Sequence, residues 1–230
     1  KDLIQDQLYV GSYLLLSFLS FMPGVFLFFF KNVENVQEDS LNEGNIRNLK
    51  SIVLQPRFLQ AITAAAFAYA VMSFLMTATP LSMHVMENMS LKETGLVLQF
   101  HVVAMFLPSL ITGNLIKKYG HSAIIYGGVL FFFITVLLSL FEQTYLNYML
   151  SLIFLGLGWN FLFISGTSLV VLTYNKEEKF KVQGINDLII FSTMALASLS
   201  AGILLNSIGW KMMNLICIPF LVLIIFVSYM

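Results

Sequence analysis

One histidine lies deep inside an apolar stretch, where ionisable side chains are rare. His101 stands in the segment LQFHVVAMFLPS, and no Lys or Arg lies in the middle of such a stretch. An imidazole titrates near neutral pH, so it could carry a proton or hydrogen-bond a polar solute. Burying an ionisable group in hydrocarbon is costly, which makes His101 a functional candidate. The alternative is a neutral histidine that is bonded to a neighbouring helix.

Further candidates stand in the middle of two other apolar stretches. In GLGWNFLFISG, Asn160 must find partners across a helix pair or in a wet cavity, and Trp159 could stack on a flat organic solute or simply pack. In FAYAVMSFLM, Tyr69 and Ser73 share one helical face and could line a pathway. Gln99 lies near His101 but points elsewhere on the same helix. It completes the set of candidates for a solute or proton pathway.

Composition shows what kind of element must position these residues. Hydrophobic residues make up 58% of the 230 residues and charged residues only 10%, with a mean hydropathy of +0.85. A soluble domain is about a quarter charged. The chain is therefore predicted to be an all-α polytopic membrane protein whose partner is the lipid bilayer. Its net charge of zero gives no support for nucleic-acid binding.

Seven apolar runs are long enough to span a bilayer, which takes roughly 20 residues in a helix. A long polar segment separates the first two runs, and its composition is typical of a flexible connector. The other links are short, so neighbouring helices should be antiparallel. The predicted runs are 8–30, 58–80, 95–116, 122–141, 146–172, 187–206 and 210–230, and the connector is 31–57.

Basic residues predict the orientation, since Lys and Arg favour cytoplasmic loops. If the connector is cytoplasmic, nine basic residues lie on that side and three on the other. The cytoplasmic residues are Lys31, Arg47, Lys50, Arg57, Lys117, Lys118, Lys176, Lys179 and Lys181, and the others are Lys1, Lys92 and Lys211.

Two segments predict an internal repeat. SLITGNLIKKYG (109–120) aligns with SLSAGILLNSIG (198–209) at an offset of 89 residues, which spans three helices. An odd number of helices places the two copies on opposite sides of the membrane. Inverted repeats of this kind underlie many secondary transporters.

Together, these features resemble the major facilitator superfamily. Its signature G-x-x-x-[DE]-[RK]-x-G-[RK] is matched by Gly113, Lys118 and Gly120, with His121 as a weaker stand-in for the last basic residue. Lys117 replaces the acidic residue, which puts the gating contact of that position in doubt. GNLIKKYGH is interpreted as a hinge corner between moving helices, or as an anchor whose lysines interact with anionic lipid.

Two further residues are candidates for gating. Pro80 lacks a backbone donor, so the second helix should kink or stop there. Asp187 is expected in the first turn of the sixth helix, where the helix dipole stabilises a carboxylate. A helix-start aspartate is commonly a capping residue, which is the alternative to a transport role.

The resemblance implies domains and partners. It makes 1–30 the last helix of an N-terminal half, 31–57 the central cytoplasmic loop, and 58–141 and 142–230 the two three-helix repeats of a C-terminal half. The partners would be the N-terminal half, a small organic solute and, through His101, protons. The family's location implies the plasma membrane, in a bacterium the inner membrane. Solutes could include drug-like or siderophore-type molecules.

Other classes of protein remain alternatives. Seven spans would also suit a membrane receptor, but no lysine in the middle of a helix could hold retinal. A half-sized protein that pairs with itself is another possibility. An enzyme would need a cluster of nucleophile, base or metal ligands, and the sequence suggests none. We therefore expect no cofactor, and the spacing of the three histidines gives no support for a metal site.

Overall fold

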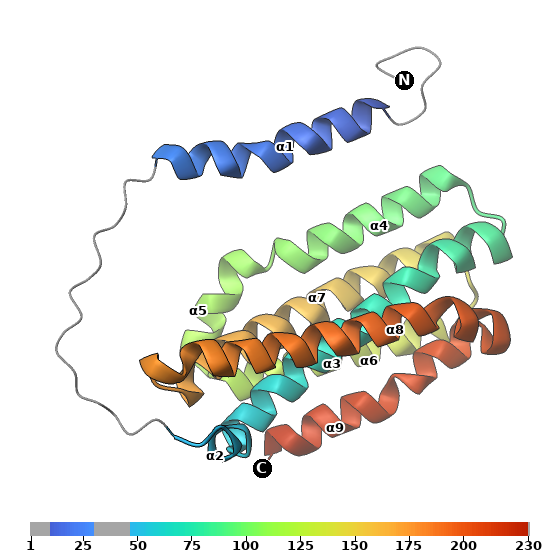
Figure 1. Ribbon diagram of the computed structural model, residues 1–230. Helices are drawn as coiled ribbons and strands as arrows, with labels where there is room; N and C mark the ends of the chain where they lie inside the picture. The colour runs from blue at the N-terminus through green and yellow to red at the C-terminus, as the bar shows by residue number, and fades with distance from the viewer. Residues whose placement is uncertain (1–9, 30–46, 230) are drawn as a thin grey trace. The chain divides into compact units, whose positions relative to one another are not determined.

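The computed structural model describes residues 10–29 and 47–229, and all regular structure in them is helical (Figure 1). The chain divides into two compact units, Lys1–Asn45 and Ile46–Met230. In the first unit, α1 (Val10–Phe29) is a 20-residue apolar helix that continues through Pro23 and has no buried residue. At 1.5 Å per residue, a helix of this length reaches across the hydrocarbon core.

The second unit contains the remaining helices. They are α2 (Leu49–Val53), α3 (Pro56–Pro80), the π-helix η1 (Leu81–Met86), α4 (Leu91–Phe106), α5 (Ser109–Tyr119), α6 (His121–Ser139), α7 (Tyr145–Val170), the 3-10 helices η2 (Val171–Thr173) and η3 (Lys176–Glu178), α8 (Lys179–Ile216) and α9 (Ile218–Tyr229).

The predicted membrane spans are present, and the described chain is an all-α polytopic membrane protein. Six stretches are long and apolar enough to cross a bilayer, and the last of them, Lys176–Tyr229, contains two predicted runs. These two runs meet at Gly209, whose φ of 74° and ψ of 170° interrupt α8. Figure 1 shows that the chain turns back near the end of α8 and that α9 returns beside it.

The two glycines paired by the predicted repeat have nearly the same backbone geometry. Gly120 has φ 84° and ψ 163°, close to the values of Gly209. Within the described ranges they are the two glycines with positive φ. A side chain at such a φ is strained, so both turns require glycine. The two aligned segments thus share a backbone turn as well as their sequence pattern.

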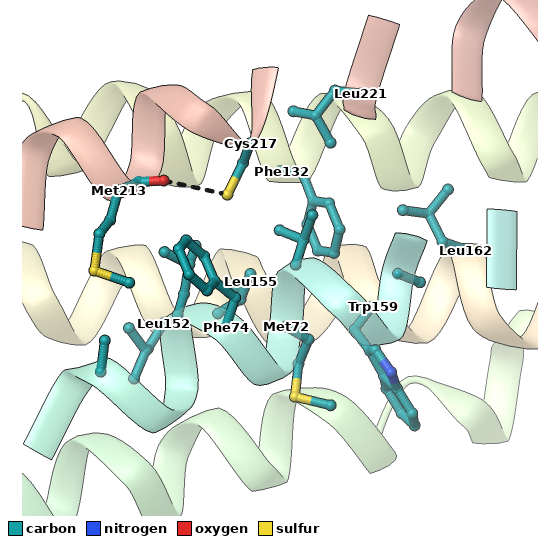
Figure 2. Packing of buried hydrophobic residues seen from close by; sticks show 14 of the residues in the cluster. Met72, Phe74, Phe132, Leu152, Leu155, Trp159, Leu162, Met213, Cys217 and Leu221 are labelled. Atoms are coloured by element: carbon teal, nitrogen blue, oxygen red, sulfur yellow. Dashed lines mark hydrogen bonds between the residues drawn. The ribbon is translucent and has the colours of Figure 1, made fainter. Parts of the chain in front are cut away.

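Helix α7 is the centre of the second unit. It packs against α3, α4 and α6, and α3 also packs against α8 and α9. Figure 2 shows Leu152, Leu155 and Leu162 of α7 in the buried cluster, together with Phe132 of α6 and Leu221 of α9.

Glycines allow α7 to approach its neighbours closely. A Cβ atom on Gly156 would lie 2.7 Å from the backbone oxygen of His101 in α4. A Cβ atom on Gly166 would lie 2.7 Å from the backbone oxygen of Ala61 in α3. Membrane helices associate through such small-residue contacts because lipid provides no hydrophobic drive between them.

Several predicted helix boundaries were wrong. The run 95–116 is two helices, because Pro108 lacks the N–H that would continue α4. This pair begins earlier than predicted, at Leu91, where Ser90 and Glu93 form a capping box. The α-helical part of α3 does end at Pro80, but the chain continues directly into η1.

Asp187 does not lie in the first turn of its helix. Helix α8 begins at Lys179 and continues through Gly184, so Asp187 stands in the third turn, exposed on the second unit. Its Oδ1 accepts a hydrogen bond from Asn186 at 3.1 Å. It therefore does not cap this helix.

The end of the predicted connector is ordered rather than flexible. Arg47 and Asn48 precede the short helix α2, and the Asn48 side chain caps this helix by accepting from the N–H of Lys50 at 3.1 Å. Residues 30–46 lie outside the described part of the chain, so the prediction is corrected only for 47–57.

The contact at Gly166 leads to a stability prediction. Gly166→Ala should destabilise the protein by about 1–3 kcal/mol, because a backbone oxygen of α3 cannot make room for the methyl group. Gly184→Ala in α8 is the control, since no atom lies within 4 Å of its added Cβ. The measurement is the thermal unfolding midpoint of the purified full-length protein in detergent. Equal midpoints for the two variants would contradict the packing account.

Candidate functional site

Aromatic side chains from four helices gather around Trp159. The indole stacks on Phe163, one turn later in α7, with 4.9 Å between ring centroids and 13° between planes. Tyr69 of α3 meets the indole edge-on at 5.2 Å, and Phe106 of α4 does so at 5.8 Å. Phe191 of α8 lies 6.1 Å from Tyr69. These five residues form what we call the aromatic cluster.

The aromatic cluster lies at the border between the core and an uncovered face of the second unit. Trp159 is only 3% exposed, whereas Phe106 and Phe191 are 59% and 52% exposed. Figure 2 shows Trp159 at the edge of the buried residues, on the opposite side from Phe132 and Leu221. The Trp159 Nε1 atom is buried without a hydrogen-bond partner. The cluster therefore offers exposed ring surface, and it also contains one buried N–H donor that has no partner among the described residues.

Asn160 is fully engaged in joining helices. Its Nδ2 donates to the backbone oxygen of Met105 at 2.6 Å and to Ser109 Oγ at 2.7 Å. Its Oδ1 accepts from Thr112 Oγ1 at 2.6 Å. The amide thus holds α7 to both sides of the break at Pro108. Of the two environments expected from the sequence, the structure favours the helix pair over a wet cavity.

His101 has one satisfied and one unsatisfied nitrogen. The residue is fully buried, and its Nδ1 lies 2.7 Å from the backbone oxygen of Leu152 in α7. A carbonyl only accepts, so Nδ1 must carry the proton and Nε2 must be the free acceptor of the neutral ring. Nε2 is buried, and it has no partner within residues 10–29 and 47–229. The predicted bond to a neighbouring helix and an unused proton-accepting atom are therefore both present.

The remaining pathway candidates are separated from His101. Tyr69 belongs to the aromatic cluster, and Ser73 lies half-buried one turn further along α3. Gln99 is exposed on α4. Trp159 and Asn160 are neighbours in sequence but contact different residues. The structure thus brings Trp159 and Tyr69 together, while His101 and Asn160 lie in the contact of α7 with α4 and α5.

The predicted hinge corner forms a turn at Gly120, between α5 and α6. Gly113 has no atom within 4 Å of an added Cβ. Lys117 and Lys118 are exposed in the last turn of α5, where basic residues suit the helix dipole. The Lys118 Nζ atom lies 4.8 Å from the ring centroid of Tyr119.

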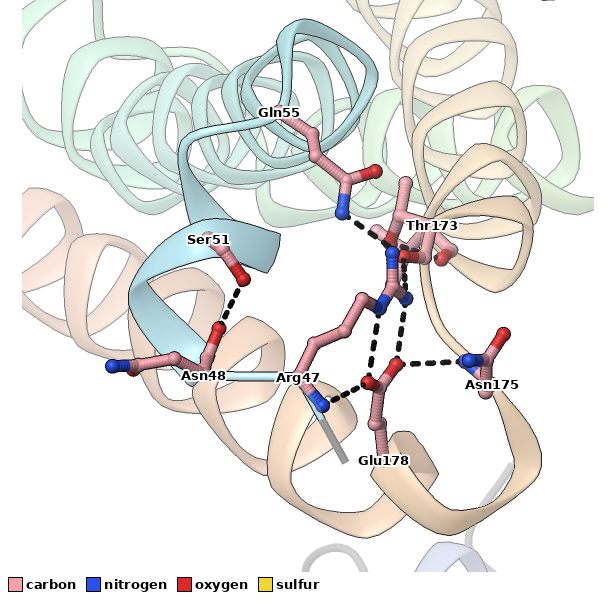
Figure 3. A network of polar contacts seen from close by, with 8 residues as sticks. Arg47, Asn48, Ser51, Gln55, Thr173, Asn175 and Glu178 are labelled. Atoms are coloured by element: carbon pink, nitrogen blue, oxygen red, sulfur yellow. Dashed lines mark hydrogen bonds and ion pairs between the residues drawn. The ribbon is translucent and has the colours of Figure 1, made fainter. Parts of the chain in front are cut away.

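A polar network that we did not predict holds the end of the connector. Arg47 donates to both Glu178 oxygens, from Nε at 3.0 Å and from a terminal nitrogen at 2.6 Å, and its backbone N–H donates to Oε1 at 2.9 Å (Figure 3). Arg47 and Gln55 also donate to the backbone oxygen of Thr173. Glu178 is 2% exposed, and the pair is the one salt bridge between described residues.

The partner of Arg47 was hard to find because 131 residues separate it from Glu178. The spacing Asn175-x-x-Glu178 was the available signal, since it forms a capping box at η3. Arg47 donates to the Glu178 carboxylate, and this bond is the main cause that lowers the pKa of Glu178 to about 2. The site lies in the link between α7 and α8, before the apolar part of α8.

Comparisons with known proteins agree with this architecture. The family model described as Major Facilitator Superfamily matches residues 62–230. The protein named Riboflavin transporter RfnT from Brucella anthropi is 35% identical over 225 residues, which cover 98% of this chain and 56% of that protein.

Two proteins of Bacillus subtilis are also similar. The uncharacterized MFS-type transporter YdeG is 27% identical over 90% of this chain and 50% of its own length. The uncharacterized MFS-type transporter YddS is 32% identical over 66% of this chain and 37% of its own length. The chain therefore spans about half the length of the curated relatives it matches.

The Arg47–Glu178 pair leads to a prediction about pH. A carboxylate with a lowered pKa stabilises the folded state above its ordinary pKa of 4.5, and this stability is lost as the pH falls through about 2. Glu178→Gln should therefore unfold at a lower temperature than the parent at neutral pH. The difference should shrink between pH 4.5 and about 2.

Glu177→Gln is the control, because the exposed Glu177 makes no described contact and should unfold like the parent. The measurement is the unfolding midpoint across this pH range. A difference between Glu178→Gln and the parent that stays constant with pH would contradict the role of the ion pair.

Proposed function

Because the chain belongs to the major facilitator superfamily, we propose that it forms the C-terminal half, with the preceding helix, of a secondary transporter. The whole protein would move a small organic solute across the membrane by alternating access, as symporter or antiporter. Its N-terminal half would be the main partner of the second unit. The names of the relatives support a transporter rather than a receptor or an enzyme.

We place the protein in the plasma membrane, which in a bacterium is the inner membrane. The relatives are bacterial. Those basic residues of the predicted cytoplasmic side that belong to residues 47–229 lie at one end of the second unit, since Arg47 bonds to Glu178 near the start of α8, and Gln60 of α3 bonds to Ser122 at the start of α6. Figure 1 shows the start of α8, α2 and α5 at the same end. This supports the predicted orientation.

The aromatic cluster is the single observation that best supports a class of solute. Exposed rings of Phe106 and Phe191 beside a nearly buried Trp159 provide flat, apolar contact area. Stacking on such rings favours a planar aromatic solute. Riboflavin, which the similar Brucella protein is named for, has a flat ring system of this kind. Drug-like or siderophore-type solutes with aromatic rings are the alternatives.

His101 is the proposed proton carrier. Its free Nε2 can accept a proton without breaking the bond from Nδ1 to Leu152. Protonation would place a charge in the contact between α4 and α7. Because a buried charge is costly, protonation of His101 would favour a conformation in which the imidazole ring reaches water or an acidic partner. Proton binding would then be linked to the change of access.

The role of Trp159 leads to a prediction for transport. In proteoliposomes with the full-length protein, Trp159→Leu should reduce riboflavin uptake at low solute concentration by roughly 5- to 150-fold, which corresponds to about 1–3 kcal/mol for one lost aromatic stack. Trp159→Phe should retain part of the uptake. Trp210→Phe is the control, because Trp210 packs on Tyr148, away from the aromatic cluster.

Amounts of folded protein are equalised by size-exclusion chromatography. Uptake that is unaffected by Trp159→Leu would remove the aromatic cluster from recognition. The parent could instead transport another aromatic solute and not riboflavin. If Trp159→Leu reduces the uptake of that solute, the aromatic cluster remains the recognition site and riboflavin is the wrong aromatic solute.

His101 is tested by uptake against an imposed pH gradient. His101→Gln should abolish the effect of the gradient on uptake and preserve exchange of solute, because the amide can still donate to Leu152 but cannot take up a proton. His84→Gln is the matched control, since His84 is exposed and lies 2.7 Å from the backbone oxygen of Met89. A gradient effect that persists in His101→Gln would exclude His101 as the carrier.

A further inference from the structure

A polar cavity of about 600 Å³ lies where three helices of the second unit meet. It is formed by the N-terminal ends of α3 and α6 and the C-terminal end of α9. Figure 1 shows the end of α9 close to the start of α3. The cavity includes no residue of the aromatic cluster, and it adjoins the Arg47–Glu178 network through Gln55, which donates to the backbone oxygen of Thr173. Its lining residues are Gln55, Pro56, Arg57, Gln60, Ser122, Val227 and Ser228.

Arg57 gives the cavity a positive charge. No carboxylate lines the cavity, and within residues 47–229 the one salt bridge is formed by Arg47 and Glu178. The exposed guanidinium of Arg57 therefore has no anionic partner in the described part of the chain. Its planar fork of donors matches the geometry of a phosphate group.

Two hydroxyl groups add donors from two other helices. Ser122 Oγ accepts a hydrogen bond from Gln60 Nε2 at 2.8 Å, which leaves its own O–H free to donate. Ser228 Oγ is buried and has no hydrogen-bond partner among the described residues. Arg57 and Ser122 thus bring a cation and a free hydroxyl donor from α3 and α6 to one cavity, and α9 adds the buried hydroxyl group of Ser228 to its wall. Such a donor set recognises an anion with several oxygen atoms.

We propose that this cavity binds the phosphate group of an anionic phospholipid. It lies at the ends of helices that are long enough to span a membrane, and the orientation proposed above, on which this inference rests, puts these ends on the cytoplasmic side. Basic pockets between such helices on that side bind anionic lipid. Val227 and Pro56 supply apolar wall for the glycerol part of the lipid. A bound lipid would contact both α3 and α9, and it would stabilise the folded protein.

The test is the thermal unfolding midpoint of the full-length protein in detergent, with and without added lipid. Phosphatidylglycerol should raise the midpoint, and phosphatidylcholine with the same acyl chains should raise it less. Arg57→Gln should lose at least half of the rise caused by phosphatidylglycerol. Lys50→Gln is the matched control, because Lys50 is an exposed cation in neighbouring α2 that does not line the cavity, and this variant should keep the full rise.

Two further measurements distinguish a bound lipid from a bound phosphate ion and test the site itself. Inorganic phosphate at constant ionic strength should not reproduce the rise, and an equal, Arg57-dependent rise with phosphate would overturn the lipid as its source. An undiminished rise in Arg57→Gln would overturn the site itself. If Arg57→Gln does not fold, native mass spectrometry of the parent and of Arg57→Lys decides. The parent should retain phosphatidylglycerol in preference to phosphatidylcholine, and Arg57→Lys should show a smaller preference. A parent that shows no preference between the two lipids would overturn the proposal.

Discussion

The close approach of α7 to α3 and α4 is the contact on which the second unit depends. Lipid offers helices no hydrophobic reason to associate, so the bundle is held by packing and by hydrogen bonds between helices. Gly156 and Gly166 bring the backbone of α7 against the backbones of α4 and α3. At this distance the side chains of α7 must either interlock with a neighbour or point to the uncovered face.

This close packing determines which buried polar atoms form hydrogen bonds between helices and which have no partner. Asn160 uses its amide to hold α4 and α5, and His101 uses Nδ1 to reach α7. The buried atoms left without a partner include His101 Nε2 and Trp159 Nε1. Of these two residues, the proposed function assigns the proton to His101 and the solute to the aromatic cluster around Trp159.

Hydropathy predicted the existence of the membrane helices but not their ends. Capping at Ser90, the break at Pro108 and the early start of α8 depend on local hydrogen bonds that an apolar pattern does not contain. The paired turns at Gly120 and Gly209 were predictable, because only glycine takes their backbone geometry freely. The partners of Asn160 and Arg47 were not, since they depend on the rotation of each helix and on a contact across 131 residues.

The most direct test of the account is the structure of the full-length protein with its solute bound, determined by cryo-electron microscopy in the presence of riboflavin. We expect density for a flat ring of the solute that contacts the exposed faces of Phe106 and Phe191. The edge of this ring should lie near Trp159. Density for the solute that makes no contact with α3, α4, α7 or α8 would contradict the assignment of the aromatic cluster as the recognition site.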